Sequence, residues 1–399
     1  MKILGLSCVY PNPAEPLLGG FVRARLERVA DSAEVKVVAP VPVFDYWSAM
    51  HGKGLFYAAV PARIEDGPIE VLHPRWVHPP FGSALLANLL YAEIVRPVKR
   101  LRRRFPFELI DAHFAYPTGV AAGLLAGAMG VPFLITLRGN ETMYARRPGC
   151  RMLMRRELRR AARVICVSER LRSFALSLGV EPAKAVTIPN GIDKQRFHPR
   201  DRAQSRRACG LPENAPIVLS AGTLIERKGH HRVIRALHEL RREGVEAHLA
   251  IAGAAGREGH YEAEIRRLVA ELDMQSSVTF LGAVTPDRMP EVMSAADVLC
   301  LASTREGWPN VVHEAMGCGA PVVATDVGGV PDMIPSEAYG AIVPVDDAAA
   351  LRDALRQALA KNWDREEIAR MAGARSWERV GLEVTEQMRA VIEEAARKR

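Results

Sequence analysis

Short strand-like segments alternate with helix-length segments along most of the chain. The first part contains six short runs rich in β-branched residues, which are KILGLSC, EVKVVAP, FELIDAH, PFLITLR, RVICVS and AVTIPN. They are separated by segments of helical length at residues 21–30, 82–104, 117–130 and 151–163. This alternation predicts a parallel sheet with helices on both faces, because parallel strands need long crossover connections.

The same alternation begins a second time after residue 215. Residues 190–215 form a polar stretch with prolines, glycines and no apolar period, which indicates a connection between domains. The 399 residues, 48% of them hydrophobic, suffice for two or three domains. We therefore expect two doubly wound Rossmann-like α/β domains, at residues 1–190 and 191–363, with ligands bound in the crevice at the carboxyl ends of the strands. Residues 364–399 are expected to be helical, with Trp377 as an apolar anchor, and to pack back toward the N-terminal domain.

Cysteine usage and the N-terminal segment favour a cytoplasmic protein. The six cysteines lack the close pairs of a metal site, and several fall in apolar runs, so we interpret them as reduced core residues. The segment MKILGLSCVYPNP is a poor signal peptide, because its apolar run is short and is followed by prolines. No apolar stretch approaches the roughly 20 residues that span a bilayer.

The net formal charge of +8 comes from the first half of the chain, because residues 201–399 carry more Asp and Glu than Lys and Arg. A basic half predicts an acidic partner, which is either nucleic acid or an anionic membrane surface. Two stretches hold much of the excess, RPVKRLRRRF at residues 96–105 and RRPGCRMLMRRELRRAAR at residues 146–163. In the second stretch arginines recur at every fourth position, as in a basic amphipathic helix, at Arg151, Arg155, Arg159 and Arg163.

Two interpretations of these basic stretches compete with the membrane. Neither stretch interleaves aromatic residues with its arginines, as a platform for single-stranded nucleic acid does, so we expect no nucleic-acid partner. An ordinary surface helix with a solvated arginine face accounts for the period equally well. The membrane is favoured over nucleic acid because each Lys or Arg near an anionic surface contributes about 1 kcal/mol.

The segment REGWPNVVHEAMGCGAPVVATDVGG, at residues 305–329, places two carboxylates around a tight turn. The preceding run DVLCLAS is a predicted strand, so its carboxyl end delivers residues 303–307 to the expected ligand site. Pro309 suits the first turn of the following helix, and the amides and dipole of a helix N-terminus suit a phosphate. Asn310 and Glu314 then share a helical face, while Glu306 projects from the loop. The alternative is a surface helix whose two acids merely favour the helix dipole.

These residues resemble the signature of the family 4 glycosyltransferases. The matching pattern runs through Glu306-Gly307, Glu314-Ala315-Met316, Gly317-Cys318-Gly319, residues 321–325 and Gly328-Gly329. Further matches, in the family's order, are Gly19-Gly20 after the first strand, IPNGID at residues 188–193 and AGTLIERKGH at residues 221–230. The resemblance extends over nearly the whole chain. It implies the two-domain GT-B fold and transfer of a sugar from a nucleotide donor with retention of anomeric configuration.

The resemblance also implies roles for residues of the second domain. Glu314 would accept hydrogen bonds from the donor ribose, Glu306 would lie near the transferred sugar, and Lys228 would neutralise the departing diphosphate. Chemistry agrees, because an ionised carboxylate accepts hydrogen bonds from paired hydroxyls and stabilises an oxocarbenium-like centre. Relatives often carry Arg at the position of Thr223, so Arg227 is the candidate for the missing cation. The remaining donor-binding candidates, several of which act through backbone amides, are Gly20, Gly307, Trp308, Asn310 and Val311.

On the first domain the resemblance places His113, at the end of the run FELIDAH, close to the sugar or the acceptor. Together with Glu306 and Lys228 it completes the set of catalytic candidates. Arg138, which stands where many relatives carry His, and Asn140 are the acceptor-side candidates. Plainer alternatives exist, because His113 could be a hydrogen-bonded core histidine and Gly19-Gly20 a simple turn.

The sequence has no Asp-x-Asp motif and no carboxylate or histidine cluster with metal-ligand spacing. We therefore predict metal-independent transfer, with the nucleotide sugar as substrate and no further cofactor, to a hydroxyl acceptor. Resembling enzymes commonly build cell-surface polysaccharides or glycolipids on lipid-linked acceptors at the cytoplasmic face of a membrane. Specificity is expected in first-domain loops such as residues 40–66.

Two other functions stay open at this stage. A nucleotide-sugar epimerase of the GT-B fold would need acid and base groups around the sugar carbon, and the first domain offers no second convincing carboxylate. A non-catalytic nucleotide-sugar sensor would have lost Glu306 or Lys228, and both are present.

Overall fold

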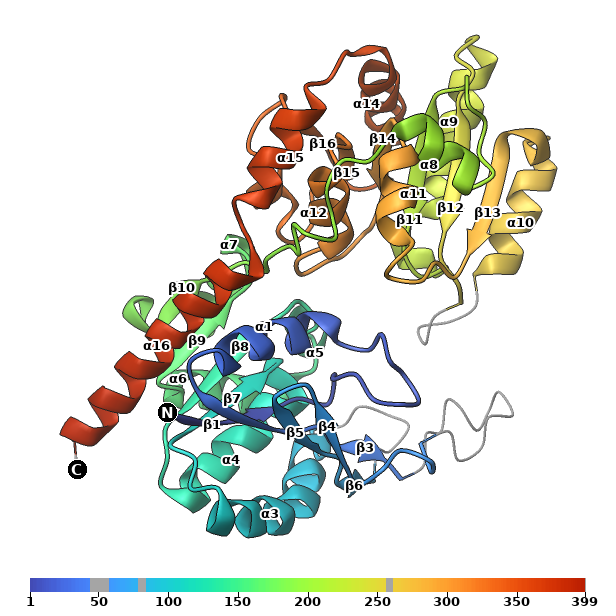
Figure 1. Cartoon of the computed structure of the whole chain (residues 1–399). Helices are drawn as coiled ribbons and strands as arrows, with labels where there is room; N and C mark the ends of the chain where they lie inside the picture. The colour runs from blue at the N-terminus through green and yellow to red at the C-terminus, as the bar shows by residue number, and fades with distance from the viewer. Residues whose placement is uncertain (44–56, 78–83, 256–260, 399) are drawn as a thin grey trace. The chain divides into compact units, whose positions relative to one another are not determined.

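The computed structural model describes residues 1–43, 57–77, 84–255 and 261–398. These residues form two compact units. The first unit comprises Met1–Gly191 and Trp377–Arg399, and the second comprises Ile192–Ser376. Each unit has a central sheet that is covered by helices (Figure 1). The units therefore have the doubly wound α/β architecture that the alternating sequence predicts.

The main sheet of the first unit has the strand order β10-β9-β8-β7-β1-β2-β5-β4 among the described residues. All neighbouring strands are parallel except β4 and β5. The strands are β1 (Lys2–Leu6), β2 (Glu34–Val38), β4 (Arg63–Asp66), β5 (Ile69–Leu72), β7 (Leu109–His113), β8 (Phe133–Leu137), β9 (Arg163–Cys166) and β10 (Ala185–Thr187). A separate pair consists of β3 (Val41–Pro42) and β6 (Arg75–Trp76).

The helices of the first unit connect these strands. They are α1 (Gly20–Ala30), α3 (Leu86–Arg104), α4 (Val120–Met129), α5 (Glu141–Tyr144), α6 (Pro148–Arg160), α7 (Glu169–Ser177) and, from the C-terminal end of the chain, α16 (Trp377–Arg397).

The second unit has a parallel sheet with the order β13-β12-β11-β14-β15-β16. Its strands are β11 (Ile217–Ala221), β12 (His248–Ala252), β13 (Val278–Gly282), β14 (Val298–Leu301), β15 (Val322–Thr325) and β16 (Gly340–Val343). Its helices are α8 (Arg202–Ala208), α9 (His230–Arg242), α10 (Glu262–Glu271), α11 (Met289–Ala295), α12 (Asn310–Gly317), α13 (Val330–Met333), α14 (Ala348–Ala360) and α15 (Arg365–Gly373).

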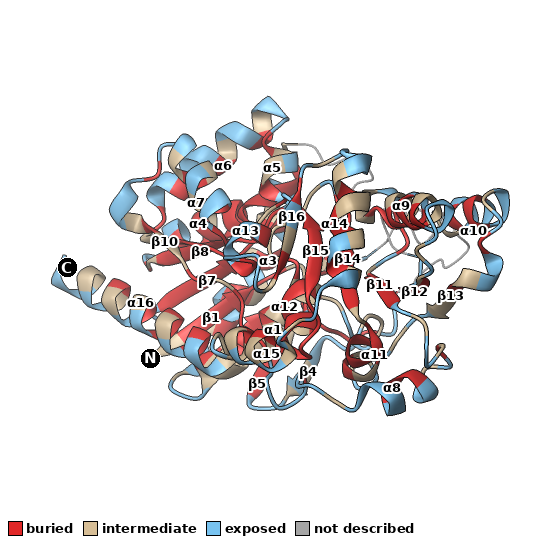
Figure 2. Ribbon diagram, turned by 90° about the horizontal axis from the view of Figure 1, so that it is seen from above, coloured by how far each residue is buried: buried red, intermediate tan, exposed pale blue. Residues whose placement is uncertain are grey.

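The central strands of both sheets are almost wholly buried, and most of their residues are apolar. Every residue of β8 and of β12 is buried, and Figure 2 shows the sheets as the buried layer beneath helices with exposed outer faces. A strand that is covered on both faces has few positions where a polar side chain can reach water. The strand ends, where the chain leaves this buried layer, are therefore the places where functional side chains can gather.

The helix predicted over residues 151–163 lies earlier in the chain than expected. Helix α6 begins at Pro148, whose fixed φ angle suits a first helical position, and it ends at Arg160. Arg163 belongs to β9 instead, where its guanidinium pairs with Glu394 of α16. The prediction that Arg163 continues the row of helical arginines is therefore wrong.

The C-terminal segment is divided between the units. Residues 364–399 were expected to pack together toward the N-terminal domain, but α15 belongs to the second unit and only α16 belongs to the first. In α16, Val380, Val384 and Met388 recur at helical spacing and are buried in the core of the first unit. Gly381 allows the close approach of α1, because a Cβ at this position would lie 2.4 Å from the Cβ of Arg28.

Two other sequence predictions concern connections. Residues 190–215 were expected to be a polar connection without regular structure, and they contain the short helix α8, which Asp201 caps by accepting a hydrogen bond from the amide of Gln204. Of the loop at residues 40–66, in which we expect specificity to reside, residues 44–56 lie outside the described part of the chain.

Candidate functional site

The strand order of the second unit reverses between β11 and β14. From β11 the chain proceeds through β12 and β13 on one side of the sheet, and β14, β15 and β16 lie on the other side. Open α/β sheets bind ligands at the carboxyl ends of the strands at such a reversal. The segments that follow these two strands, residues 222–229 and 303–309, contain half of the predicted donor-binding residues, together with Glu306.

Glycines allow these segments to pack tightly against one another. Gly229 has a φ of 75°, and a Cβ there would lie 1.9 Å from the carbonyl oxygen of Ala302. Gly328 has a φ of 53°, and its Cβ would lie 2.5 Å from the carbonyl oxygen of Glu306. Any larger residue would collide with backbone at both places, so glycine is required there. The backbone around Glu306 is thereby fixed from two sides.

Backbone hydrogen bonds complete this arrangement. The amide of Thr304 donates to the carbonyl of Arg227 over 2.9 Å, and the amide of Gly329 donates to the carbonyl of Gly307 over 2.8 Å. The guanidinium of Arg227 donates to the carbonyl of Arg305 over 2.8 Å. Three segments that are distant in the sequence therefore form one rigid edge.

Glu306 and Lys228 meet at this edge. The Nζ of Lys228 lies 2.7 Å from Oε1 of Glu306, and the guanidinium of Arg227 lies 3.6 Å from the same oxygen. The hydroxyl of Ser303 also donates to Oε1, over 2.7 Å. Both partners of the Glu306–Lys228 pair keep only a small exposed surface, 10% and 15% of their side chains. The structure thus brings together two predicted catalytic residues that are separated by 78 positions.

Ser303 is a site residue for which the sequence analysis predicts no role. The segment Ser303-Thr304-Arg305-Glu306 has the Ser-x-x-Glu spacing in which side chain and backbone often bind each other at a helix start. That spacing was the available signal, although the hydroxyl here binds the Glu306 carboxylate and not a helix amide.

Glu314 lies on α12, in the turn that follows the helix start at Asn310. Loss of solvent around the carboxyl group raises the pKa of Glu314 to about 7, and the positive charge of Arg196 opposes this increase. Among the described residues no side chain or amide donates a hydrogen bond to the Glu314 carboxylate, which keeps a partly exposed surface. Hydrogen-bond donors of a ligand would strongly stabilise the ionised form of such a carboxylate, because the protein supplies none.

The other predicted residues of this edge lie at or before the start of α12. Pro309 is the N-cap residue and Asn310 is the first helical residue, one position later than expected. The indole ring of Trp308 packs on the core of the second unit, with its centroid 6.1 Å from that of His313. Its backbone, together with that of Gly307, Asn310 and Val311, leads into the helix N-terminus, where the amides point toward the start of the helix.

Two candidates of the first unit lie at the carboxyl ends of the neighbouring strands β7 and β8, and β7 lies beside β1 in the sheet. His113 is the last residue of β7 and is fully buried, and Arg138, just after β8, is 8% exposed. The Nε and NH2 groups of Arg138 both donate to Nδ1 of His113, over 3.2 and 2.9 Å. The NH1 group of Arg138 donates to the side-chain oxygen of Asn190 over 2.9 Å.

Asp111 and Arg25 extend this buried network. The guanidinium of Arg25 donates to both oxygens of Asp111, over 2.7 and 2.6 Å, and to the hydroxyl of Thr136 over 2.7 Å. Nε2 of His113 lies 3.4 Å from Asp111. Because Nδ1 of His113 accepts from Arg138, the imidazole proton is assigned to Nε2, which faces Asp111.

The buried position sets the charge states in the network. Burial and the charge of Arg25 lower the pKa of His113 to about 3, so the imidazole is neutral at physiological pH. Burial acts to raise the pKa of Asp111, but the Arg25 guanidinium holds it well below its usual range. Burial also lowers the pKa of Arg138. His113 thus has the environment of the hydrogen-bonded core histidine that was the alternative to a catalytic role.

Gly20 and Asn140 differ from His113 and Arg138 because they are exposed. Gly20 begins α1 after Gly19, whose left-handed conformation brings the turn within contact distance of Val9. The aromatic ring next to it, that of Phe21, lies 4.8 Å from the guanidinium carbon of Arg138. Asn140 is the N-cap residue of α5, and its side chain makes no capping hydrogen bond.

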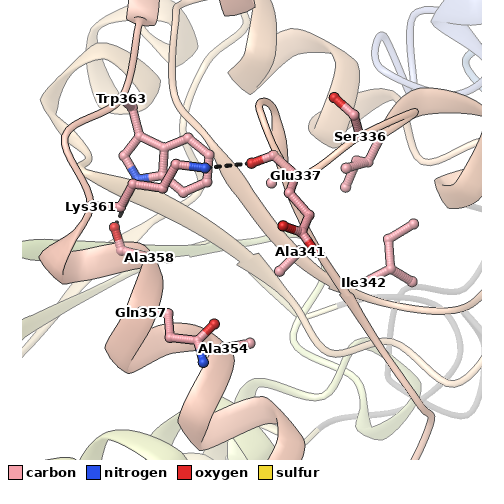
Figure 3. Close-up of a pocket in the computed structure, with 11 residues that line it drawn as sticks. Ser336, Glu337, Ala341, Ile342, Ala354, Gln357, Ala358, Lys361 and Trp363 are labelled. Atoms are coloured by element: carbon pink, nitrogen blue, oxygen red, sulfur yellow. Dashed lines mark hydrogen bonds between the residues drawn. The ribbon is translucent and has the colours of Figure 1, made fainter.

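A pocket of about 450 Å³ lies elsewhere on the second unit, along the edge strand β16 (Figure 3). The Nζ of Lys361 lies 4.0 Å from the ring centroid of Trp363 and donates to the carbonyl of Glu337 over 2.6 Å. The indole NH of Trp363 donates to the carbonyl of Ala358 over 2.8 Å. None of the predicted site residues lines this pocket.

Metal-binding clusters and membrane-spanning helices are both absent from the described residues. Across residues 1–43, 57–77, 84–255 and 261–398, no group of three or more His, Cys, Asp or Glu residues is arranged to hold a metal ion. The helices in these ranges include none with the length and apolar character of a membrane span.

Two family models match the chain, one for each half. The model described as "Glycosyltransferase Family 4" matches residues 11–196, and the model described as "Glycosyl transferases group 1" matches residues 201–375. Together they cover nearly all of both units.

Curated proteins with similar sequences are bacterial. A putative teichuronic acid biosynthesis glycosyltransferase, TuaC of Bacillus subtilis (strain 168), is 27% identical over 89% of this chain and 88% of its own length. A GDP-mannose-dependent alpha-(1-6)-phosphatidylinositol monomannoside mannosyltransferase of Mycolicibacterium smegmatis is 32% identical over 66% of this chain and 70% of its own length.

Solved structures share the fold. A sucrose-phosphate synthase from Thermosynechococcus elongatus has a TM-score of 0.79 and 24% identity, covering 99% of this chain and 100% of that chain. Anabaena HepE in complex with UDP-glucose has a TM-score of 0.73 and 20% identity, covering 98% and 100%.

Proposed function

Because the chain belongs to the family 4 glycosyltransferases of the GT-B fold, we propose that it transfers a sugar from a nucleotide-diphosphate donor to a hydroxyl acceptor with retention of anomeric configuration. The observation that carries this proposal is the pairing of Glu306 with Lys228 at the strand reversal of the second unit, where α12, which carries Glu314, follows β14. We further propose that the transferred sugar is a hexose, as the name of the mannosyltransferase relative states for that protein.

Each residue has a role that its surroundings support. Glu314 accepts hydrogen bonds from the donor ribose, because its carboxylate has no protein donor among the described residues. Lys228 and the first-turn amides of α12 neutralise the departing diphosphate, with Arg227 as a second cation. The Glu306 carboxylate stabilises the positive charge that develops on the sugar as the bond to the diphosphate breaks.

The first unit supplies the acceptor side in this proposal. His113 and Arg138 form hydrogen bonds with one another, and Arg138 also binds Asn190. Their role in this proposal is therefore to hold the local backbone in place and not to donate hydrogen bonds to a ligand. Gly20 and Asn140 are the exposed candidates for contact with sugar or acceptor.

A nucleotide screen tests the donor assignment. We expect UDP, GDP or ADP, or their hexose conjugates, to raise the melting temperature of the wild-type protein. Glu314→Ala should remove that increase, and Glu337→Ala, which removes an exposed carboxylate of the same unit outside the site, should keep it. If no nucleotide of the panel shifts the melting temperature, or if both variants behave alike, the donor site is assigned wrongly.

Product analysis separates transfer from the two other functions. With a nucleotide sugar and no acceptor, an epimerase equilibrates the sugar, whereas a transferase leaves it unchanged or hydrolyses it slowly. With an acceptor, the new glycosidic bond should have the anomeric configuration of the donor. A donor that binds but is never consumed would favour a sensor.

We propose that the transfer needs no metal ion. Lys228, Arg227 and the amides of α12 stand where a diphosphate requires charge compensation, and they supply it without a metal. Turnover should therefore survive excess EDTA. Loss of turnover that Mg²⁺ or Mn²⁺ restores would contradict this proposal.

We propose that the first unit binds an anionic membrane surface. The acceptor is then lipid-linked, and the protein acts at the inner face of the cell membrane. The exposed side of α6 carries Arg151, Arg155 and Arg159, which have no acidic partner among the described residues. On the same helix Met152 is 66% exposed. Such a face suits interfacial binding, because arginines attract anionic headgroups and an apolar side chain can enter the lipid.

The residues just before α3 add to this face. A Cβ on Gly149, in the first turn of α6, would lie 2.8 Å from the Cβ of Ala84, which precedes α3. Leu85, the next residue, is 64% exposed. An exposed apolar side chain next to Ala84 is therefore available in addition to Met152 and the arginines of α6.

Vesicle binding tests this partner. The protein should bind anionic vesicles in a salt-sensitive manner and bind neutral vesicles weakly. Reversal of Arg151, Arg155 and Arg159 to Glu should abolish binding without changing the nucleotide-induced melting shift. The matched control reverses Arg242, Arg266 and Arg267 of the second unit, with the same change in net charge, and should keep binding. Equal binding to both vesicle types, or to neither, would reject the membrane role.

A further inference from the structure

The two carboxylate oxygens of Glu306 have different surroundings. Oε1 has three cationic or hydroxyl groups around it, with Lys228 and Ser303 each at 2.7 Å and Arg227 at 3.6 Å. Oε2 has no hydrogen-bond partner among the described residues. It is not one of the fully buried polar atoms, so it is in contact with solvent. The side chain is thus anchored at one oxygen and open at the other.

The three groups on Oε1 differ in how firmly they are held. The charged groups of Lys228 and Arg227 lie at the ends of long, flexible side chains. An anionic ligand at this edge also attracts them, so they can move away from Oε1. The hydroxyl of Ser303 is one bond from its Cβ, and Ser303 is fully buried directly after β14. The Ser303 hydroxyl therefore has less freedom to leave Oε1 than either cation.

Neighbouring strand β15 fixes Ser303 in turn. The hydroxyl of Thr325, the last residue of β15, donates to the carbonyl of Ser303 over 2.5 Å and approaches the carbonyl of Leu301 at 3.3 Å. Thr325 is itself 2% exposed. A chain of two hydrogen bonds thus leads from the buried end of β15 through Ser303 to Oε1 of Glu306.

We propose that Ser303 is a positioning residue, fixed by Thr325, that keeps Oε1 of Glu306 anchored when Lys228 turns toward the diphosphate, so that Oε2 faces the transferred sugar. This inference rests on the proposed transferase function. It adds a residue to that function. The Ser303 hydroxyl keeps the Glu306 carboxylate in place while Lys228, the cationic partner of Glu306, also binds the substrate. Ser303 itself does not touch the sugar.

Crystal structures of Ser303 variants with bound UDP, GDP or ADP, whose diphosphate attracts Lys228, test the positioning without the transferred sugar. In Ser303→Ala the Glu306 carboxylate should rotate or become disordered, because neither of its two close donors then remains on Oε1. Ser303→Cys has nearly the same volume but donates weakly, so it should resemble the Ala variant, whereas Ser303→Thr keeps the hydroxyl and should keep the carboxylate in place. A Glu306 carboxylate that keeps the wild-type position in nucleotide-bound Ser303→Ala, after Lys228 has turned to the diphosphate, overturns the inference.

Kinetics with the nucleotide sugar that supports turnover, from a panel of UDP-glucose, GDP-mannose and ADP-glucose, give the second readout. Ser303→Ala should lower kcat by about 10- to 100-fold, as expected for a misplaced catalytic group, and should change the donor KM by less than about 3-fold. Ser303→Thr should recover most of the loss. Ser294→Ala, a serine that is equally buried in α11, should leave both constants unchanged.

A double-mutant cycle separates positioning from general packing. In a Glu306→Gln background Ser303→Ala should have little further effect on kcat, because the hydroxyl acts through the carboxylate. An unchanged, fully additive loss would overturn the inference and indicate a structural role. If the carboxylate moves in the crystal as expected but no nucleotide sugar of the panel is turned over, the positioning is supported and the proposed transferase function fails.

Discussion

In the second unit, the segments after β11 and β14 leave Oε2 of Glu306 and the carboxylate of Glu314 without protein donors among the described residues. In the first unit, the side chains after β7 and β8 bind one another, and His113 and Arg138 are buried together with the Arg25–Asp111 pair. Both sets occupy the same place in a doubly wound unit, at the carboxyl ends of central strands. The same topology thus carries an open polar edge in one unit and a closed polar network in the other.

The difference shows that position at a strand end does not by itself make a side chain a ligand contact. The buried side chains of the first network are held by several hydrogen bonds to one another, which rigidify the surrounding backbone, although Nε2 of His113 and Nε of Arg25 have no hydrogen-bond partner. An edge with unpartnered oxygens can gain hydrogen bonds from a ligand. We therefore expect substitutions in the first network to affect mainly stability, and substitutions at the second edge to affect mainly activity or affinity.

The largest effect is expected from Asp111→Ala. Removal of the carboxylate leaves the guanidinium of Arg25 buried without its charged partner, which should lower the free energy of unfolding by about 3–5 kcal/mol. Denaturant titration measures this change. Glu65→Ala, which breaks the exposed pair with Arg63, is the control and should change stability little. If Asp111→Ala unfolds at the wild-type denaturant concentration, the first network is not closed in the sense proposed here.

Glu306→Gln tests the open edge. The amide keeps the shape but not the negative charge, so kcat should fall by about 100- to 1000-fold while donor affinity changes little. The melting temperature should fall only slightly, because the amide oxygen can still accept hydrogen bonds from Ser303 and Lys228. Wild-type turnover in Glu306→Gln would show that the catalytic assignment is wrong.

Much of the comparison could be predicted from the sequence because it depends on local pattern. The alternation of strands and helices indicated two doubly wound units, and the strand-turn-helix pattern around Glu306 placed that residue at a strand end. The family resemblance assigned Lys228 and Glu306 to the same donor, but it did not predict the contact of the two side chains, which lie 2.7 Å apart in the structure.

The closed network could not be predicted in the same way. His113 has Arg138 and Asp111 as partners, and Asp111 in turn binds Arg25, which lies 86 positions earlier on a helix. No period or motif in a single sequence reports such a contact, so the choice between a catalytic and a core histidine stayed open. The split of the C-terminal helices was missed for a similar reason, because α15 and α16 are both amphipathic and only tertiary packing decides which unit each one joins.

The smallest effect is expected from Glu314→Gln, and it has opposite signs for binding and stability. The pKa of Glu314, about 7 in the folded protein, lies above the usual value of about 4.3 for the unfolded chain. The folded state therefore holds this proton more tightly, and the carboxylate destabilises the protein increasingly as the pH rises from about 4.3 to 7. At pH 8 Glu314→Gln should stabilise the protein by about 1–2 kcal/mol, discounted for partial exposure, and at pH 4 it should have little effect.

The same variant should weaken nucleotide binding about 10-fold at pH 8, because an amide is a weaker acceptor than a carboxylate. Wild-type affinity should itself decline as the pH falls through 7. Calorimetric titration with the nucleotide from the melting screen, at pH 6 and pH 8, measures both trends, with Glu337→Gln as the exposed control. Equal affinity at the two pH values, together with unchanged stability of Glu314→Gln, would show that the Glu314 carboxylate is not the open acceptor that distinguishes the second unit.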